Sequence, residues 1–400
     1  MRKYLEEVDI QSLINMQPSC KMKVETFESI INYGLDTLLP LKSKTNISND
    51  PPWISQSLRK LIKRRQVALA HGNQTLFKSL RNQVNRERKS CRQRFYSSKV
   101  EHLKTCSQAE WWKEAKKLSG ISSQVRVDPF SFLRNMGSTS GNNPTELEDL
   151  ANMINKTFLE PTKDFNALPI ETDDDVPREN TQPYRVSEMS VNRKLTKLIK
   201  TKATGPDGIP AWLLKENSDI LAAPISEILN SSYQEAGLPQ SWKCADIAPI
   251  PKHKPVQEVN KDLRPISLTP IISKVADDYI VDEFVKPAVL RRVDPNQYGA
   301  IPRSSPVFAL LSMIHKWNEA TDGTGATVRV VLFDFKKAFD LIDHHLLLSK
   351  LATYDIPQWV YIWIKDFLTG RKQRVKLNQN SYSDWADISA GVPQGTKLGP

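Results

Sequence analysis

The sequence predicts an α+β fold preceded by a mainly α-helical, basic N-terminal region, and three observations support this. Apolar residues recur at helical spacing through much of residues 22–240, which is typical of amphipathic helices. From Trp242 the pattern changes to short alternating runs, which are typical of strands. Residues 328–333 form a β-branched apolar run without a turn former, which predicts a buried strand.

Composition and cysteine usage restrict the class of protein. The chain has 400 residues, of which 39% are apolar and 25% charged, so it can hold two or three globular domains. Four scattered cysteines without a Cys-x-x-Cys pair favour a reducing compartment and argue against a structural zinc site. Because we find no signal peptide and no membrane-spanning run, we expect an intracellular protein, nuclear or cytoplasmic, without a membrane partner.

Positive charge gathers in one segment. Residues 59–104 hold fourteen lysine and arginine residues against Glu87 and Glu101. Apolar spacing over residues 53–118 predicts two or three long helices, interrupted at Gly72 and Asn73. Solvated helix faces would explain the charge. We favour contact with nucleic-acid phosphates, because so dense a cluster repels itself and gains most from a polyanion. The predicted nucleic-acid-binding residues are Arg64, Arg65, Arg86, Arg88, Lys89, Arg92 and Arg94.

Composition also divides the chain into regions. Serine, glycine and asparagine are in excess at 121–144, and 173–177 is acidic and contains a proline, so both are expected to be connections. The predicted regions are a basic helical region at 1–120, a linker with one short helix at 121–185, and two further regions at 186–327 and 328–400.

One candidate metal ligand ends the strand predicted at 328–333. A carboxylate at this point, Asp334, can meet a hard cation without placing a charge in the core. Capping of the helix that follows is an equally good explanation. The neighbouring pair His344 and His345 lies at a helix start, where adjacent side chains point in different directions, so we expect no metal site there.

Two further stretches carry groups suited to a nucleotide. Strands predicted within 242–251 and at 262–268 would form a hairpin with a basic tip, which is either a site for a triphosphate or an ordinary surface hairpin. Glycines and a proline at 391–395 predict a tight turn that leaves the amide of Gln394 free for a base or sugar edge. The basic residues of the hairpin are Lys252, Lys254 and Arg264.

Six stretches, taken in order, resemble the reverse transcriptase of non-LTR retrotransposons, the LINE-type elements of the jockey-like kind. Any one of them could arise by chance, whereas all six in the right order form a specific pattern over about half of the chain. They are residues 202–209, 250–252, 264–268, 296–299, 334–340 and 391–395.

The resemblance implies a right-hand polymerase, with fingers at 186–327 and a partial palm at 328–400. It implies an RNA-directed DNA polymerase that extends a DNA primer on an RNA template, using deoxynucleoside triphosphates and two Mg²⁺ ions. Asp334 would be the catalytic metal ligand, and Phe339 would exclude a 2′-hydroxyl. The nucleotide-binding residues would be Lys252, Arg264, Phe339 and Gln394.

One departure from the family pattern bears on activity. The family palm also carries an aromatic-x-Asp-Asp motif, which we do not find in residues 1–400, and residues 276–279 cannot replace it because they precede Asp334. One carboxylate cannot hold two mutually repelling divalent ions. We therefore expect a truncated element copy or partial gene model that is inactive alone. The alternative is a basic nucleic-acid-binding relic without catalysis.

Overall fold

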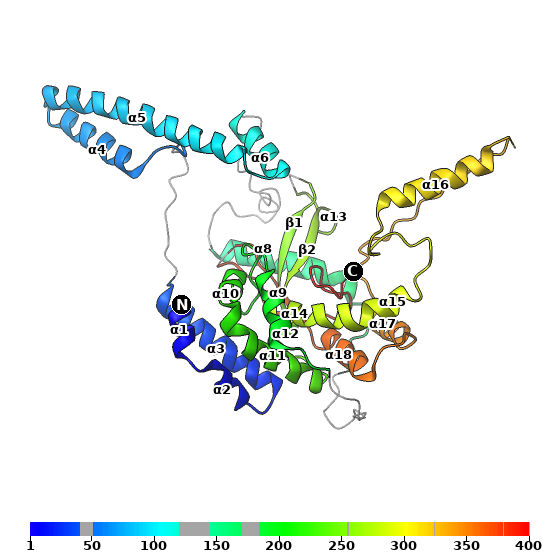
Figure 1. Ribbon diagram of the computed structural model, residues 1–400. Helices are drawn as coiled ribbons and strands as arrows, with labels where there is room; N and C mark the ends of the chain where they lie inside the picture. Colours follow the sequence, from blue (N-terminus) through cyan, green and yellow to red (C-terminus); the bar gives the residue numbers. More distant parts are fainter. Residues whose placement is uncertain are drawn as a thin grey trace. The chain divides into compact units, whose positions relative to one another are not determined.

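The computed structural model describes residues 1–40, 51–119, 144–169, 184–253, 256–323, 325–378 and 380–399. The predicted connection at 173–177, and almost all of that at 121–144, lie outside these residues. The described fold is a mixed α/β fold, mostly helical with one small mixed sheet, in agreement with the predicted class (Figure 1). Contacts divide it into two compact units, one formed by Met1–Pro40 with Pro129–Pro400 and the other by Leu41–Asp128.

The first unit has a large helical core. Its centre is the long helix α11, which buries an apolar face and its own Pro224, and the fully buried Trp363 donates its indole N–H to Ser232 of that helix at 3.0 Å. The helices of this core are α1 (Arg2–Glu7), α2 (Ile10–Asn15), α3 (Cys20–Leu38), α9 (Glu188–Thr196), α10 (Ala211–Glu216), α11 (Ser218–Gln234), α14 (Ile271–Ile280), α17 (His344–Leu351) and α18 (Gln358–Leu368).

Capping residues fix the starts of several of these helices. Ser187 caps α9 by accepting from the backbone N–H of Ser190. Asp343 caps α17 by accepting from the N–H groups of His345 and Leu346, at 2.8 and 3.2 Å. The helical spacing predicted through much of residues 22–240 is confirmed by α3, α9, α10 and α11.

The sheet has four strands in the order β2-β1-β3-β4. The predicted hairpin is confirmed, because β1 (Cys244–Pro251) pairs antiparallel with β2 (Leu263–Leu268), and Ile250 lies opposite Arg264. Strand β3 (Lys372–Val375) pairs antiparallel with β4 (Ala386–Asp387). The sequence did not predict that β3 would join β1 in parallel register, which brings residues 372–375 beside residues 244–247.

A second apolar cluster packs helix α8 (Pro144–Leu159) against this sheet. The buried residues Leu150, Ile154 and Phe158 of α8 contact the cluster that contains Ile247 and Val375 of the strands. Asn155 also accepts a hydrogen bond from Gln373 of β3 at 2.9 Å. Helix α8 and the short 3-10 helix η1 (Glu160–Thr162) are therefore part of the core, although they fall in the range predicted to be a linker.

The buried strand predicted at 328–333 is wrong. These residues are extended but pair with no strand among the described residues, and Leu332 and Phe333 are 86% and 88% exposed. The physical reason is the lack of a neighbour, since an extended run becomes a strand only when its backbone groups find a partner. The apolar pattern was present, but residues 328–333 join neither β2 nor β4, the edge strands of the sheet.

The first unit has further elements, and α12 (Gln240–Lys243) among them buries Trp242 in the helical core. They are α12, α13 (Val259–Asp262), the π-helix η2 (Val281–Val285), α15 (Lys286–Leu290) and α16 (Pro306–Thr321). Helix α16 carries apolar residues, yet none of its side chains is buried in the described structure.

The second unit is a helical hairpin. Helix α4 (Gln56–Ala70) and the 30-residue helix α5 (Gln74–Leu103) pack through Leu58, Val84 and Cys91, and α6 (Gln108–Leu118) follows. The three helices confirm the prediction for 53–118. The contacts separate this unit from residues 1–40, which the predicted region 1–120 had joined to it, because α2 and α3 pack on α11.

The role of α8 in the core can be tested by truncating a buried side chain. We expect Ile154→Ala, at a fully buried position, to lower the free energy of unfolding by about 2–5 kcal/mol, since it removes apolar contacts and leaves a cavity. Urea denaturation followed by tryptophan fluorescence measures this. Met153→Ala, on the exposed side of the same helix, is the control and should cost only about 0.5 kcal/mol. Equal effects of the two substitutions would contradict the packing of α8.

Candidate nucleotide pocket

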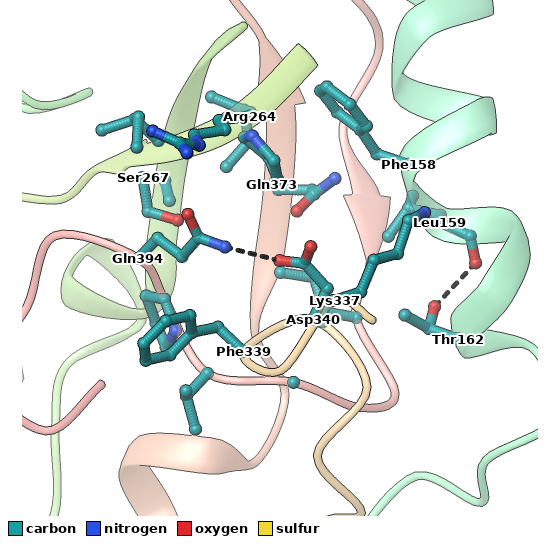
Figure 2. Close-up of a pocket in the computed structure, with 18 of the residues that line it drawn as sticks. Phe158, Leu159, Thr162, Arg264, Ser267, Lys337, Phe339, Asp340, Gln373 and Gln394 are labelled. Carbon is teal, nitrogen blue, oxygen red and sulfur yellow. Dashed lines mark hydrogen bonds between the residues drawn. The ribbon is translucent and has the colours of Figure 1, made fainter. Parts of the chain in front are cut away.

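A cavity of about 460 Å³ lies beside the sheet, among elements that are far apart in the sequence. Strand β2 contributes Arg264 and Ser267, the turn at 337–340 contributes Phe339 and Asp340, and the loop after β4 contributes Gln394. Figure 2 shows these side chains around the cavity, with Phe158 and Thr162 of α8 and η1 on another side. Four segments of different structure thus meet at one site.

The turn at 337–340 and the loop at 391–394 are joined through their backbones. The N–H of Gly391 donates to the carbonyl of Ile342, and that of Val392 to the carbonyl of Phe339, both at 2.8 Å. Gly391 has a φ of +84°, and a Cβ there would lie 2.7 Å from the carbonyl oxygen of Asp340. Only glycine allows this close approach.

A buried histidine forms a hydrogen bond to the same loop. The ring Nε2 of His344 lies 2.7 Å from the carbonyl oxygen of Gly391, and because a carbonyl only accepts, the ring nitrogen is the donor. Burial lowers the pKa of His344, which favours the neutral ring. His344 therefore has a structural role in supporting the site.

Gln394 is held at both its backbone and its side chain. Its carbonyl oxygen accepts from the N–H of Ser267 in β2 at 2.8 Å, and its Nε2 donates to Oδ1 of Asp340 at 3.2 Å (Figure 2). Burial raises the pKa of Asp340, while nearby Lys337 and the Gln394 amide act in the opposite direction. The amide is thus placed beside Phe339 at the edge of the cavity.

The cavity is electropositive. Of the described residues that line it, four are cations and one, Asp340, is a carboxylate; the cations are Lys252, Arg264, Lys337 and Arg371. Arg264 is exposed, and its side chain has neither a hydrogen bond nor an ion pair within the described residues. Its guanidinium is therefore available to a ligand. An excess of unneutralised cations in a cleft attracts an anion with several oxygens.

Two of these cations are fixed by the protein. Lys252 donates to the carbonyl of Lys261 at 2.9 Å, and Lys337 donates to Oδ1 of Asn260 at 2.9 Å. Burial lowers the pKa of Lys337, and the charge of Asp340 opposes that effect. Both ammonium groups have further N–H donors that their protein acceptors do not use.

Arg371 is the buried cation of the site. Its side chain is almost fully buried, it donates to the carbonyl of Phe367 at 2.9 Å, and its guanidinium lies 4.5 Å from the centre of the Phe367 ring. Burial lowers its pKa to about 10, so it remains charged at neutral pH. Its Nε and Nη2 have no protein partner among the described residues.

The structure brings the four predicted nucleotide-binding residues to one cavity, which the predicted metal ligand does not line. Lys252, Arg264, Phe339 and Gln394 all line the cavity, whereas Lys254 lies outside the described residues. Asp334 is exposed within the extended run and does not line the cavity. Sequence reasoning overlooked Asp340, Lys337 and Arg371 as site residues, although the position of Asp340 next to Phe339 was a usable signal.

The described residues do not fit a pair of metal ions. They contain no group of three His, Cys, Asp or Glu side chains that could hold a metal ion. The cavity offers only the carboxylate of Asp340, which is already bonded to an amide. Two divalent ions need several anionic oxygens, which the described residues of the cavity do not supply.

Comparison with known proteins agrees with the geometry. Residues 250–400 match the family described as reverse transcriptase (RNA-dependent DNA polymerase). The match covers less than half of the chain. All four predicted nucleotide-binding residues lie in the matched segment, whereas the part of the cavity wall formed by α8 and η1 precedes it.

Similar proteins come from mobile elements. The chain is 30% identical over 226 residues to a probable RNA-directed DNA polymerase from transposon BS of Drosophila melanogaster, covering 55% of this chain and 24% of that protein. It is 28% identical over 211 residues to the RNA-directed DNA polymerase from mobile element jockey of the same species, covering 52% and 23%. The matched part is thus about a quarter of each of these relatives.

The second unit carries the predicted nucleic-acid-binding residues. Six of them are exposed and Arg65 is half-buried. Arg94 donates to Glu87 at 3.0 Å, and the guanidinium of Arg92 lies 5.9 Å from the centre of the Tyr96 ring.

None of the helices in the described ranges combines the length and the apolar character needed to cross a bilayer.

Proposed function

We propose that the chain takes part in RNA-directed DNA synthesis and that the cavity receives the incoming deoxynucleoside triphosphate. One observation carries this proposal: four cations, Phe339 and Gln394 line a single cavity, and all six lie in the segment that matches the reverse transcriptase family. The similar proteins from transposon BS and jockey are named as RNA-directed DNA polymerases, which supports the same activity. The proposed partners are an RNA template and a DNA primer.

Each side chain has a proposed task. Lys252 and Arg264 bind the phosphates, because a guanidinium and an ammonium donate charge-assisted hydrogen bonds to phosphate oxygens. Phe339 packs beside the sugar and excludes a 2′-hydroxyl. Gln394 presents its amide to the nucleotide. The fingers are assigned to 186–327 and the partial palm to 328–400.

The proposed metal ligand is Asp334, by resemblance to the family. Its exposed position leaves it accessible to a cation, but it stands apart from the cavity. We therefore propose that residues 1–400 bind a nucleotide without carrying out the two-metal reaction by themselves.

A second candidate function is nucleic-acid binding by the helical hairpin. On α5, the buried residues Leu80, Val84 and Cys91 share one face. At about 100° per residue, Arg88 and Arg92 fall about 60° and about 100° around the helix from that face, and Arg86 and Arg94 fall about 140° and about 60° from it in the other direction. The exposed face with Arg88 and Arg92 is the better phosphate-binding surface, since Arg94 is already paired with Glu87.

Nucleotide binding tests the first proposal. We expect Lys252→Gln and Arg264→Gln each to weaken the binding of dTTP to the 400-residue chain about tenfold, because each loses a charge-assisted hydrogen bond to a phosphate. Isothermal titration calorimetry measures the dissociation constants. Lys261→Gln is the matched control, since Lys261 lies on the same hairpin, pairs with Glu258 and does not line the cavity. The proposal fails if all three variants bind dTTP like the wild type.

Primer extension tests whether residues 1–400 can hold the metal ions that catalysis needs. With a DNA primer annealed to an RNA template, deoxynucleoside triphosphates and Mg²⁺, we expect residues 1–400 to give no extension on a denaturing gel, because one carboxylate cannot hold two ions. Extension that Asp334→Asn abolishes would contradict this expectation, since it would show that this chain assembles a working metal site.

Salt dependence tests the second function. We expect the pair Arg88→Gln and Arg92→Gln to lower the slope of log K against log salt for single-stranded nucleic acid by about 1.4, as two phosphate contacts are lost. Fluorescence anisotropy at several salt concentrations gives the slope. The pair Arg86→Gln and Arg94→Gln removes the same charge from other faces and should change it less. Equal changes would mean that no face of α5 is preferred.

A further inference from the structure

A second cavity, of about 600 Å³, shares part of its wall with the first. The rest of the second cavity is formed by helix α14, by residues 198–202 after α9 and by the turn at 395–399. Three lysines line it, and their environments differ sharply. They are Lys202, Lys274 and Lys397.

Lys397 is held by two carboxylates. Its ammonium nitrogen lies 3.2 Å from Oδ1 of Asp278 in α14 and 3.0 Å from Oδ2 of Asp282 in η2. Burial lowers the pKa of Lys397, but the two carboxylates outweigh burial and raise the pKa overall. Lys397 therefore stays protonated, and a protonated amine has no lone pair with which to attack an electrophile.

Lys274 has the opposite environment in the same cavity. Its side chain is half-buried, and its ammonium group has neither a hydrogen bond nor an ion pair within the described residues. It lies in the first turn of α14, where the positive end of the helix dipole disfavours a further positive charge. Burial and position both favour the neutral amine at Lys274.

Charged groups on two elements act on Lys274. Burial and the charge of Lys202 lower the pKa of Lys274 to about 8, whereas Asp277 and Asp207 act in the opposite direction. Asp277 lies on the same helix and Asp207 lies in the turn after Lys202, and the described structure has no ion pair between either carboxylate and Lys274. Near pH 8 a large fraction of Lys274 is therefore neutral, whereas an ordinary lysine is almost entirely charged.

We propose that Lys274 is a nucleophile that forms an imine with an aldehyde that also carries a phosphate group, and that Lys202 binds the phosphate. A lysine is activated in this way where it is desolvated and close to another cation. Lys202 is exposed, and its side chain has no hydrogen bond or ion pair in the part of the chain that the structure describes, so it can donate to phosphate oxygens. This site does not depend on the proposed nucleotide binding.

The reaction needs only the amine and the aldehyde. The lone pair of Nζ attacks the carbonyl carbon and forms the carbon–nitrogen bond, and the carbonyl oxygen leaves as water with the two protons of the amine. The carbon keeps the oxidation level of the aldehyde, so no oxidant or reductant is consumed. Because an imine hydrolyses in water, detection requires its reduction to a stable amine by borohydride.

Pyridoxal 5′-phosphate is a suitable probe, since it carries both an aldehyde and a phosphate. After the 400-residue chain is treated with this probe and borohydride, peptide mass spectrometry locates the label. We expect Lys274 to carry about tenfold more label than Lys397, which lines the same cavity but is held protonated. Lys274→Arg keeps the charge and should remove this label. Equal labelling of Lys274 and Lys397 would overturn the inference.

Two further measurements separate an activated lysine from an accessible one. Labelling of Lys274 should rise with an apparent pKa of about 8, and a profile that rises only near pH 10, as for an ordinary lysine, would reject the nucleophile. In Lys202→Gln, the preference for pyridoxal 5′-phosphate over pyridoxal should fall about fivefold, because only the former has a phosphate to bind. An unchanged preference would reject Lys202 as the phosphate ligand.

Two sources of such an aldehyde are distinguished by a second probe. An oligonucleotide with one abasic site presents the ring-opened aldehyde of its sugar between two phosphates. Borohydride trapping of Lys274 by this oligonucleotide would assign the site to a nucleic-acid strand, whereas trapping by pyridoxal 5′-phosphate alone would assign it to a small molecule. Trapping of Lys274 by neither probe would overturn the inference.

Discussion

The site depends on the close contact between the turn at 337–340 and the loop at 391–394. A side chain at Gly391 would collide with the backbone of Asp340, and the φ of +84° is itself unfavourable for other residues. Two backbone hydrogen bonds join the segments once they are this close. Without this contact, Phe339 and Gln394 would lie on separate loops with no defined relation. The position of the site thus follows from backbone packing more than from any one side-chain interaction.

The sequence predicted much of the fold because local signals were strong there. Capping residues such as Ser187 and Asp343 fix helix starts through short-range hydrogen bonds, which do not depend on the rest of the chain. The alternating runs around residues 244–251 likewise found their partner only a short loop away. By contrast, the parallel pairing of β3 with β1 joins residues over 120 positions apart, and nothing local encodes it.

The same distinction applies to the site. Lys252, Arg264, Phe339 and Gln394 were identified because each lies in a stretch that resembles a known family, and the structure brings all four to one cavity. Arg371 was overlooked because burial of a cation is a tertiary property, arising where Phe367 and the sheet meet. The strand predicted at 328–333 failed for a related reason. An apolar run indicates which side chains can be buried, but their burial also requires a neighbouring element that covers them.

The charges of the cavity separate two tasks that a polymerase combines. Cations can bind phosphate oxygens directly, and the proposed triphosphate site would use the cations that line this cavity. Phosphoryl transfer needs anionic oxygens that concentrate divalent ions at the reacting groups, and the cavity supplies only Asp340. That carboxylate is occupied by an amide and is partly desolvated, which disfavours its charge. Its environment therefore suits the orientation of a neighbour better than the binding of a metal, and this is why recognition and catalysis are expected to respond differently to substitutions here.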